Sequence, residues 1–219
     1  MKNIIFILSL ISIISCKKEQ NQAAQNVSSS DSLAVKTDSI QTKNDTIKSV
    51  DDIKKEYAEV NALLTSKKLG STGFKYICEE GGREGEVFFY YQDKKLKAVK
   101  NFYSEYSHFS SVTEYYIDKE NVYFIFKQDT SWNFDTEAPK KSEDVSETKD
   151  DITERRIYLL NNGPVQCLEK KYIIRSVENN QDPGTIPNKE IKCSVDELMK
   201  TYQSILKNKD KKGEINQCL

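Results

Sequence analysis

About seven runs of residues typical of β-strands follow one another between residues 74 and 177. Each run is rich in β-branched and aromatic residues and is bounded by turn formers. The runs cover residues 74–80, 85–91, 95–104, 110–117, 121–128, 153–160 and 164–177. Several are joined by short polar turns such as Gln92-Asp93-Lys94, and turns this short join neighbouring strands antiparallel. The pattern predicts an antiparallel meander.

A helical pattern lies on each side of these strands. Apolar residues recur at helical spacing at Ile53, Tyr57, Val60 and Leu64, which predicts a helix over residues 51–68 with Gly70 as its C-terminal glycine. A second helix is predicted from Ser194, whose spacing to Glu197 is that of a capping box. Its predicted buried face is Val195, Leu198, Tyr202 and Ile205. We therefore predict an α+β fold, a meander of about seven strands with one helix before it and one after it.

The central strands are apolar at consecutive positions, as in "VFFYY" (87–91) and "VYFIF" (122–126). Both faces of the sheet are therefore expected to be apolar. We expect the two helices to cover one face. The other face requires loops, curling of the sheet or a partner, and long loops are predicted at residues 129–152 and 178–192.

Five aromatic residues are candidates for a partner surface. Tyr90, Tyr123 and Tyr158 fall on neighbouring predicted strands and could line the second face. Trp132, the only tryptophan, and Phe134 fall in the predicted polar loop. Two alternatives remain open: the loop closes over that face as a lid, or it presents an aromatic contact site to a protein or glycan.

The N-terminus has the features of an export signal. An apolar run, Ile4–Ile14, follows Lys2 and is too short to span a bilayer but suits a secretory signal. It ends in Ile13-Ile14-Ser15-Cys16, which resembles the lipobox of bacterial lipoproteins. The resemblance implies a signal peptide over residues 1–15, cleavage after Ser15 and acylation of Cys16. An ordinary secreted protein with a chance cysteine is the alternative.

The same resemblance implies a location. A lipid on Cys16 would anchor the protein to a membrane of the cell envelope. An aspartate after the lipid cysteine often signals retention in the inner membrane, so Lys17 favours the outer membrane. Residues 16–50 contain no aromatic residue and are polar, which predicts a disordered tether. Residues 51–219 carry all 12 tyrosines and are predicted to form a single domain.

Four more cysteines follow, Cys78, Cys167, Cys193 and Cys218. An even count in an oxidising compartment predicts disulfides, and no C-x-x-C spacing indicates a redox motif or a zinc knuckle. Four cysteines allow three pairings, and buried free thiols are the alternative. We favour Cys167–Cys193 with Cys78–Cys218, although the sequence leaves the pairing open.

The net charge and the motifs of the chain indicate neither nucleic-acid binding nor a metal site. With 33 basic and 34 acidic side chains the chain has no basic stripe, so no nucleic-acid partner is predicted. The single histidine, His108, cannot form a two-histidine metal site and stands in no known catalytic motif. No metal, cofactor or catalytic residue is predicted.

Three functions remain. We favour a non-enzymatic binding or structural module on a membrane anchor, with an envelope protein or a glycan as its partner. The alternative is an envelope inhibitor or chaperone-like module that acts on another protein. The third is a hydrolase with a carboxylate pair drawn from Glu79, Glu80, Glu84 and Glu86, which flank a glycine turn.

Overall fold

A computed structural model of the chain describes residues 46–138, 146–176 and 180–219. These residues belong to one compact unit, Asn44–Leu219. The predicted signal peptide, the lipidation site Cys16 and most of the predicted tether lie outside the described residues. Those three predictions are therefore not tested by the fold.

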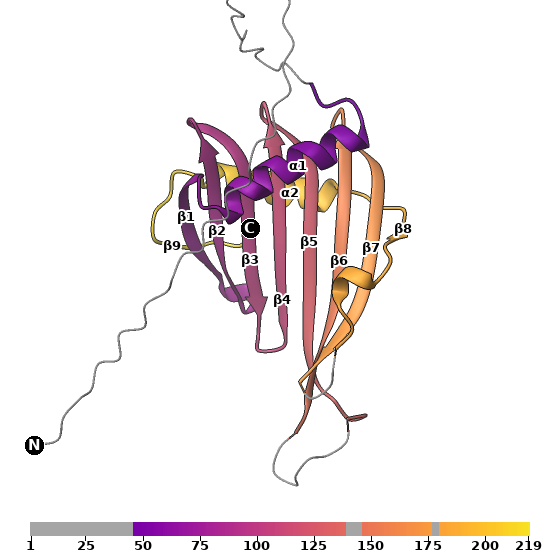
Figure 1. Cartoon of the computed structure of the whole chain (residues 1–219). Helices are drawn as coiled ribbons and strands as arrows, with labels where there is room; N and C mark the ends of the chain where they lie inside the picture. Colours follow the sequence, from indigo (N-terminus) through magenta and orange to yellow (C-terminus); the bar gives the residue numbers. More distant parts are fainter. Residues whose placement is uncertain (1–45, 139–145, 177–179) are drawn as a thin grey trace, which may run out of the picture. The chain divides into compact units, whose positions relative to one another are not determined.

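The described part of the chain is an α+β fold with one sheet of nine strands (Figure 1). The strands are β1 (Gly70–Cys78), β2 (Arg83–Gln92), β3 (Lys95–Glu105), β4 (Phe109–Asp118), β5 (Asn121–Phe134), β6 (Thr148–Leu160), β7 (Gly163–Arg175), β8 (Lys189–Glu190) and β9 (Glu214–Asn216). The helices are α1 (Val50–Thr65) and α2 (Asp196–Lys207), and two short 3-10 turns are η1 (Glu79–Gly81) and η2 (Pro183–Thr185). Strands β1 to β8 form an antiparallel meander, whereas β9 pairs parallel with β1. The predicted fold class is confirmed, with β8 and β9 as two short strands that were not predicted.

Helix α1 presents the apolar face that its sequence predicts. Its Ile53 and Val60 are buried in a cluster with residues of the sheet. The helix ends at Thr65, however, and its C-terminal turn is closed by a hydrogen bond of 2.9 Å from the Lys68 N–H to the Leu63 carbonyl. Lys67 takes the left-handed conformation there, with φ 54°. The predicted end at residue 68 with Gly70 as the C-terminal glycine is therefore wrong, and Gly70 instead begins β1.

Helix α2 also buries its predicted face, but its predicted cap does not form. The helix begins at Asp196, and Val195 in the N-cap position is buried against the sheet. Ser194 therefore lies one residue too early to reach the N–H of Glu197. Its hydroxyl oxygen instead accepts from the Asp196 N–H at 3.3 Å, while Glu197 pairs with Lys200.

The two helices lie on opposite sides of the sheet (Figure 1). Val195, Tyr202 and Ile205 of the α2 region pack in one buried cluster, and Ile53 and Val60 of α1 pack in another. Consecutive strand residues supply both clusters because strand side chains alternate between the faces. The expectation that both helices cover one face is therefore wrong, since each helix covers part of a different face.

Two disulfides close the fold. Cys78 bonds to Cys218 and Cys167 bonds to Cys193, with Cα–Cα distances of 4.6 and 6.2 Å. This is the pairing favoured from the sequence. The first bond holds the segment after β9 against the end of β1, and the second holds the segment before α2 against β7. Two disulfides indicate an oxidising, extracytoplasmic location.

The β5–β6 hairpin is longer than predicted. Strand β5 continues to Phe134 and β6 begins at Thr148, so residues 129–134 and 148–152 of the predicted 129–152 loop are paired strand. The pairing of β4 with β5 ends at Phe109 opposite Ser131, and the hairpin extends beyond it. Polar residues alternate with Trp132 and Phe134 along this stretch, which is itself the pattern of a strand exposed on one side. The polar composition misled the loop prediction.

Candidate binding surface

Helix α1 covers only part of its side of the sheet. It packs over Tyr116, Phe124 and Tyr158, and the same side of the strands continues past the helix toward the far end of the hairpin (Figure 1). We call this continuation the open α1-side face. By strand alternation it comprises Phe88, Phe102, Val112, Phe126, Trp132 and Phe134. Phe102 is 40% exposed and Phe134 is 58% exposed.

The opposite side of the same strands is charged. Arg155 Nε lies 3.0 Å from Glu169 Oε2, and Lys171 Nζ lies 3.1 Å from Glu169 Oε1. Lys127 pairs with Asp129 on the neighbouring strand. Such a ladder of paired charges is a surface that water solvates well. The two most exposed phenylalanines of the strands, Phe102 and Phe134, lie on the α1 side.

Ion pairs hold the polar side chains that border the aromatic rings. Lys100 Nζ lies 3.0 Å from Glu114 Oε1, and the Tyr116 hydroxyl donates to Glu114 Oε2 at 3.0 Å. The Arg156 guanidinium lies over the Phe126 ring at 5.3 Å. These contacts pair the charged groups that border the rings.

A buried charge cluster borders the open α1-side face at β6 and β7. Glu154 accepts a hydrogen bond of 2.7 Å from the Tyr172 hydroxyl and lies 3.3 Å from Lys170 Nζ. Lys170 also donates to the Pro183 carbonyl at 2.8 Å, which attaches η2 to the sheet. Burial raises the pKa of Glu154, but the Tyr172 hydrogen bond and the Arg156 and Lys170 charges outweigh it and hold that pKa below its usual value. These contacts hold η2 against β7.

An aromatic group lies at the far end of the hairpin. The Trp132 ring centroid is 4.9 Å from that of His108 and 5.0 Å from that of Phe134. His108 Nδ1 is 3.3 Å from the Trp132 carbonyl oxygen. Trp132 is partly exposed on β5, so the predicted lid over the tyrosines does not exist.

The five aromatic residues predicted as one partner surface occupy two places. Tyr123 and Tyr158 are buried beneath α1, and the partly buried Tyr90 packs against the same cluster. Trp132 and Phe134 lie on the open α1-side face. Thus α1 is the lid that covers the tyrosines.

Four residues of the open α1-side face were not predicted from the sequence: Phe88, Phe102, Val112 and Phe126. Their signal was present, because each lies at an alternate position of a predicted strand. Which of the two alternating sets a helix covers depends on tertiary packing, and the sequence does not state it.

The four glutamates considered for a carboxylate pair lie on two elements. Glu79 and Glu80 are exposed in η1, whereas Glu84 and Glu86 lie on the α1 side of β2. Within the described ranges no group of three or more His, Cys, Asp or Glu residues could hold a metal ion.

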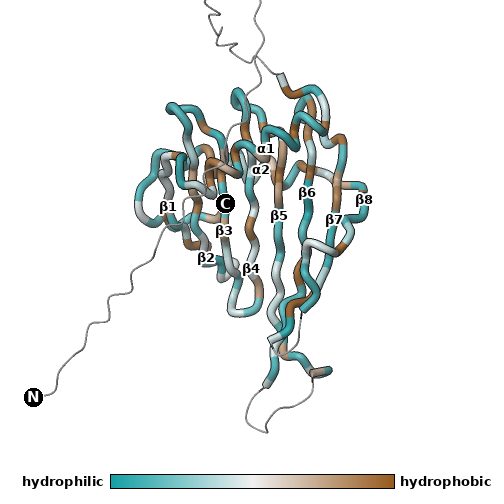
Figure 2. Tube along the Cα trace, in the orientation of Figure 1, coloured by the Kyte–Doolittle hydropathy of each residue, from teal (hydrophilic) through white to brown (hydrophobic). Residues whose placement is uncertain are grey.

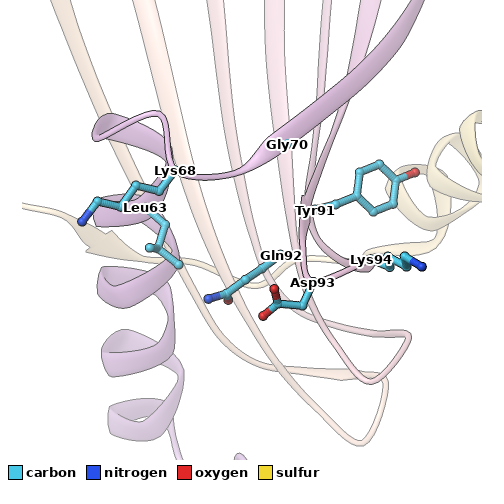
Figure 3. Close-up of a pocket in the computed structure, with 7 residues that line it drawn as sticks. All are labelled: Leu63, Lys68, Gly70, Tyr91, Gln92, Asp93 and Lys94. Carbon is cyan, nitrogen blue, oxygen red and sulfur yellow. The ribbon is translucent and has the colours of Figure 1, made fainter.

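A shallow hollow of about 680 Å³ lies between the end of α1 and the β2–β3 turn (Figure 3). Gln92 and Asp93 extend toward the helix, whereas Tyr91 and Lys94 extend away from it (Figure 3). A small-molecule site needs polar groups that converge on one point. The side chains of this hollow diverge, and the turns around it are mostly hydrophilic (Figure 2).

Comparison of the chain with protein-family models, curated proteins and solved structures finds no match. In the part of the chain that the structure describes, no helix is both long and apolar enough to cross a membrane. The fold therefore defines the class of protein only as an α+β domain with two disulfides, whose sheet carries one helix on each side.

Proposed function

We propose that this protein is a lipid-anchored module of a bacterial cell envelope that binds a partner without catalysing a reaction. Cys16 carries the lipid, and the open α1-side face contacts the partner. The partner is an envelope protein.

The observation that carries the proposal is the difference between the two sides of the same strands. On the α2 side, water can solvate a ladder of paired charges formed by Lys127, Asp129, Arg155, Glu169 and Lys171. The α1 side carries Phe102, which is 40% exposed, and the partly exposed Phe88 and Phe126. An exposed apolar patch with a polar border is typical of a protein interaction site.

Two features support the location. The sequence before and at Cys16 resembles a lipobox, and the two disulfides suit an oxidising compartment. Lys17 in place of an aspartate favours the outer membrane. The polar residues between Cys16 and α1 would hold the domain away from the lipid surface.

The experiment uses two exposed apolar residues on opposite sides of the sheet. Phe102 is 40% exposed on the α1 side and Ile173 is 41% exposed on the α2 side. The full chain, lipid included, is purified from detergent-solubilised envelopes with its cross-linked partner. We expect Phe102→Asp to lose the partner and Ile173→Asp to retain it, with both variants melting like the parent. Equal recovery by both variants contradicts the proposed surface.

A further inference from the structure

The hairpin end of the open α1-side face combines aromatic rings with a negative charge. Trp132 lies between His108 and Phe134, with ring centroids within 5.0 Å on each side. Asp150 pairs directly opposite Trp132 in the β5–β6 register. Opposed residues of an antiparallel pair project to the same side, with Cβ atoms about 5 Å apart. The Asp150 carboxylate therefore lies beside the Trp132 ring.

The polar side chains of β3 to β7 that lie nearer α1 on this side form ion pairs. Lys97 pairs with Glu56, Lys100 with Glu114, and both Arg156 and Lys170 with Glu154. Among the described residues, Asp150 makes neither an ion pair nor a side-chain hydrogen bond. Its neighbour Asp151 projects to the other side, where it accepts a hydrogen bond of 3.1 Å from Asn133.

We propose that the group formed by Trp132, Phe134 and Asp150 binds a lysine or arginine side chain of a protein partner. The cation lies over the Trp132 ring and faces the Asp150 carboxylate, a geometry in which both the ring and the carboxylate attract it. Phe134, 58% exposed, contacts the aliphatic stem. This inference rests on the proposed function, because it names the chemistry of the partner at one end of the open α1-side face.

A glycan is the competing ligand, and the dependence of binding on charge distinguishes it from a cationic side chain. A sugar ring stacked on Trp132 does not require the negative charge of Asp150. A cationic side chain does, and its binding weakens as salt screens the charges. His108 contacts Trp132, so all titrations are made at the same pH, 8.

Trp132 provides the signal because it is the only tryptophan of the chain. The full lipidated chain in detergent is titrated with tetra-arginine, tetra-glutamate and chitotetraose while Trp132 emission is followed. We expect a saturable, salt-sensitive change with tetra-arginine and none with tetra-glutamate. Asp150→Asn weakens the tetra-arginine affinity about five-fold, whereas Asp151→Asn, with the same change in net charge, weakens it less than about two-fold.

Three results overturn the inference. The first is no saturable change with tetra-arginine. The second is equal weakening by Asp150→Asn and Asp151→Asn, which indicates only general electrostatic attraction. The third is a chitotetraose response that Asp150→Asn leaves unchanged and that exceeds the tetra-arginine response. Loss of the envelope partner in Phe102→Asp is measured separately, so the proposed function survives each of these results.

Discussion

Two buried tyrosines, Tyr76 and Tyr123, differ in whether the hydroxyl has a hydrogen-bond partner. The Tyr76 hydroxyl donates to Asn101 Oδ1 at 3.1 Å, and both side chains are almost fully buried. The Tyr123 hydroxyl is also buried, beneath α1, but has no hydrogen-bond partner among the described residues. Burial raises the pKa of Tyr76 to about 12 and raises that of Tyr123 further.

This pair gives a test with a matched control. Removing an unpaired buried hydroxyl removes a desolvation cost, so Tyr123→Phe is expected to raise the free energy of unfolding by about 1 kcal/mol. Tyr76→Phe leaves Asn101 unpaired and is expected to lower it by about 1 to 2 kcal/mol. Urea denaturation of both variants measures the difference. A loss of stability in Tyr123→Phe contradicts the assignment of an unpaired hydroxyl.

Glu154 gives a prediction that depends on pH. Its pKa in the folded protein is below its ordinary value of 4.5, so its stabilising contribution is present above that pH and is lost as pH falls through the lowered pKa. Glu154→Gln leaves Lys170 and Arg156 without their carboxylate and is expected to cost about 3 kcal/mol at pH 7. The stability difference between the parent and the variant should shrink as the pH falls below 4.5. A constant difference down to strongly acid pH, measured by denaturant unfolding, contradicts the role of the carboxylate charge.

At the scale of elements, the helices and the central strands could be predicted because the spacing of their apolar residues follows which side chains are buried. Ile53 and Val60 on α1 and Tyr202 and Ile205 on α2 are buried as their spacing indicates. The ends were less predictable. Lys67 takes a left-handed conformation that glycine usually takes, and buried Val195 displaces the cap of α2.

The candidate surface was predicted only in part, for a related reason. Phe134 is exposed and Trp132 is partly exposed on the open α1-side face. Tyr123 and Tyr158 lie beneath α1 instead. The alternation of side chains along a strand assigns residues to two faces of the sheet. The packing of α1 then determines which aromatic residues are exposed to water.

The two disulfides should stabilise the fold unequally. The bonds join cysteines 26 and 140 positions apart, and the chain-entropy model gives about 3 and about 5 kcal/mol for loops of these lengths. We expect Cys78→Ser with Cys218→Ser to lower the free energy of unfolding more than Cys167→Ser with Cys193→Ser. Urea denaturation ranks the two double variants. Four free thiols in the denatured, unreduced parent contradict both bonds.

At the scale of the whole molecule, the proposed function separates anchoring from binding. We propose that Cys16 attaches the chain to the membrane and that the folded unit presents its open α1-side face to a partner. The anchor is tested by Cys16→Ser, which removes the acylated sulfur. We expect the parent to partition into the detergent phase and the variant into the aqueous phase, because the acyl chains supply the membrane affinity. A variant that partitions as the parent does contradicts the lipid anchor.

The sides of the sheet give the most direct test of binding. A photo-cross-linking amino acid replaces Phe102 on the open α1-side face or, as the control, Ile173 on the α2 side, in full-length protein exported to the envelope of living cells. The two positions are 40% and 41% exposed, so reach and solvent access are matched. We expect a discrete adduct with one envelope protein from position 102 and none from position 173. Adducts of the same pattern from both positions, or an adduct from position 173 alone, would contradict it.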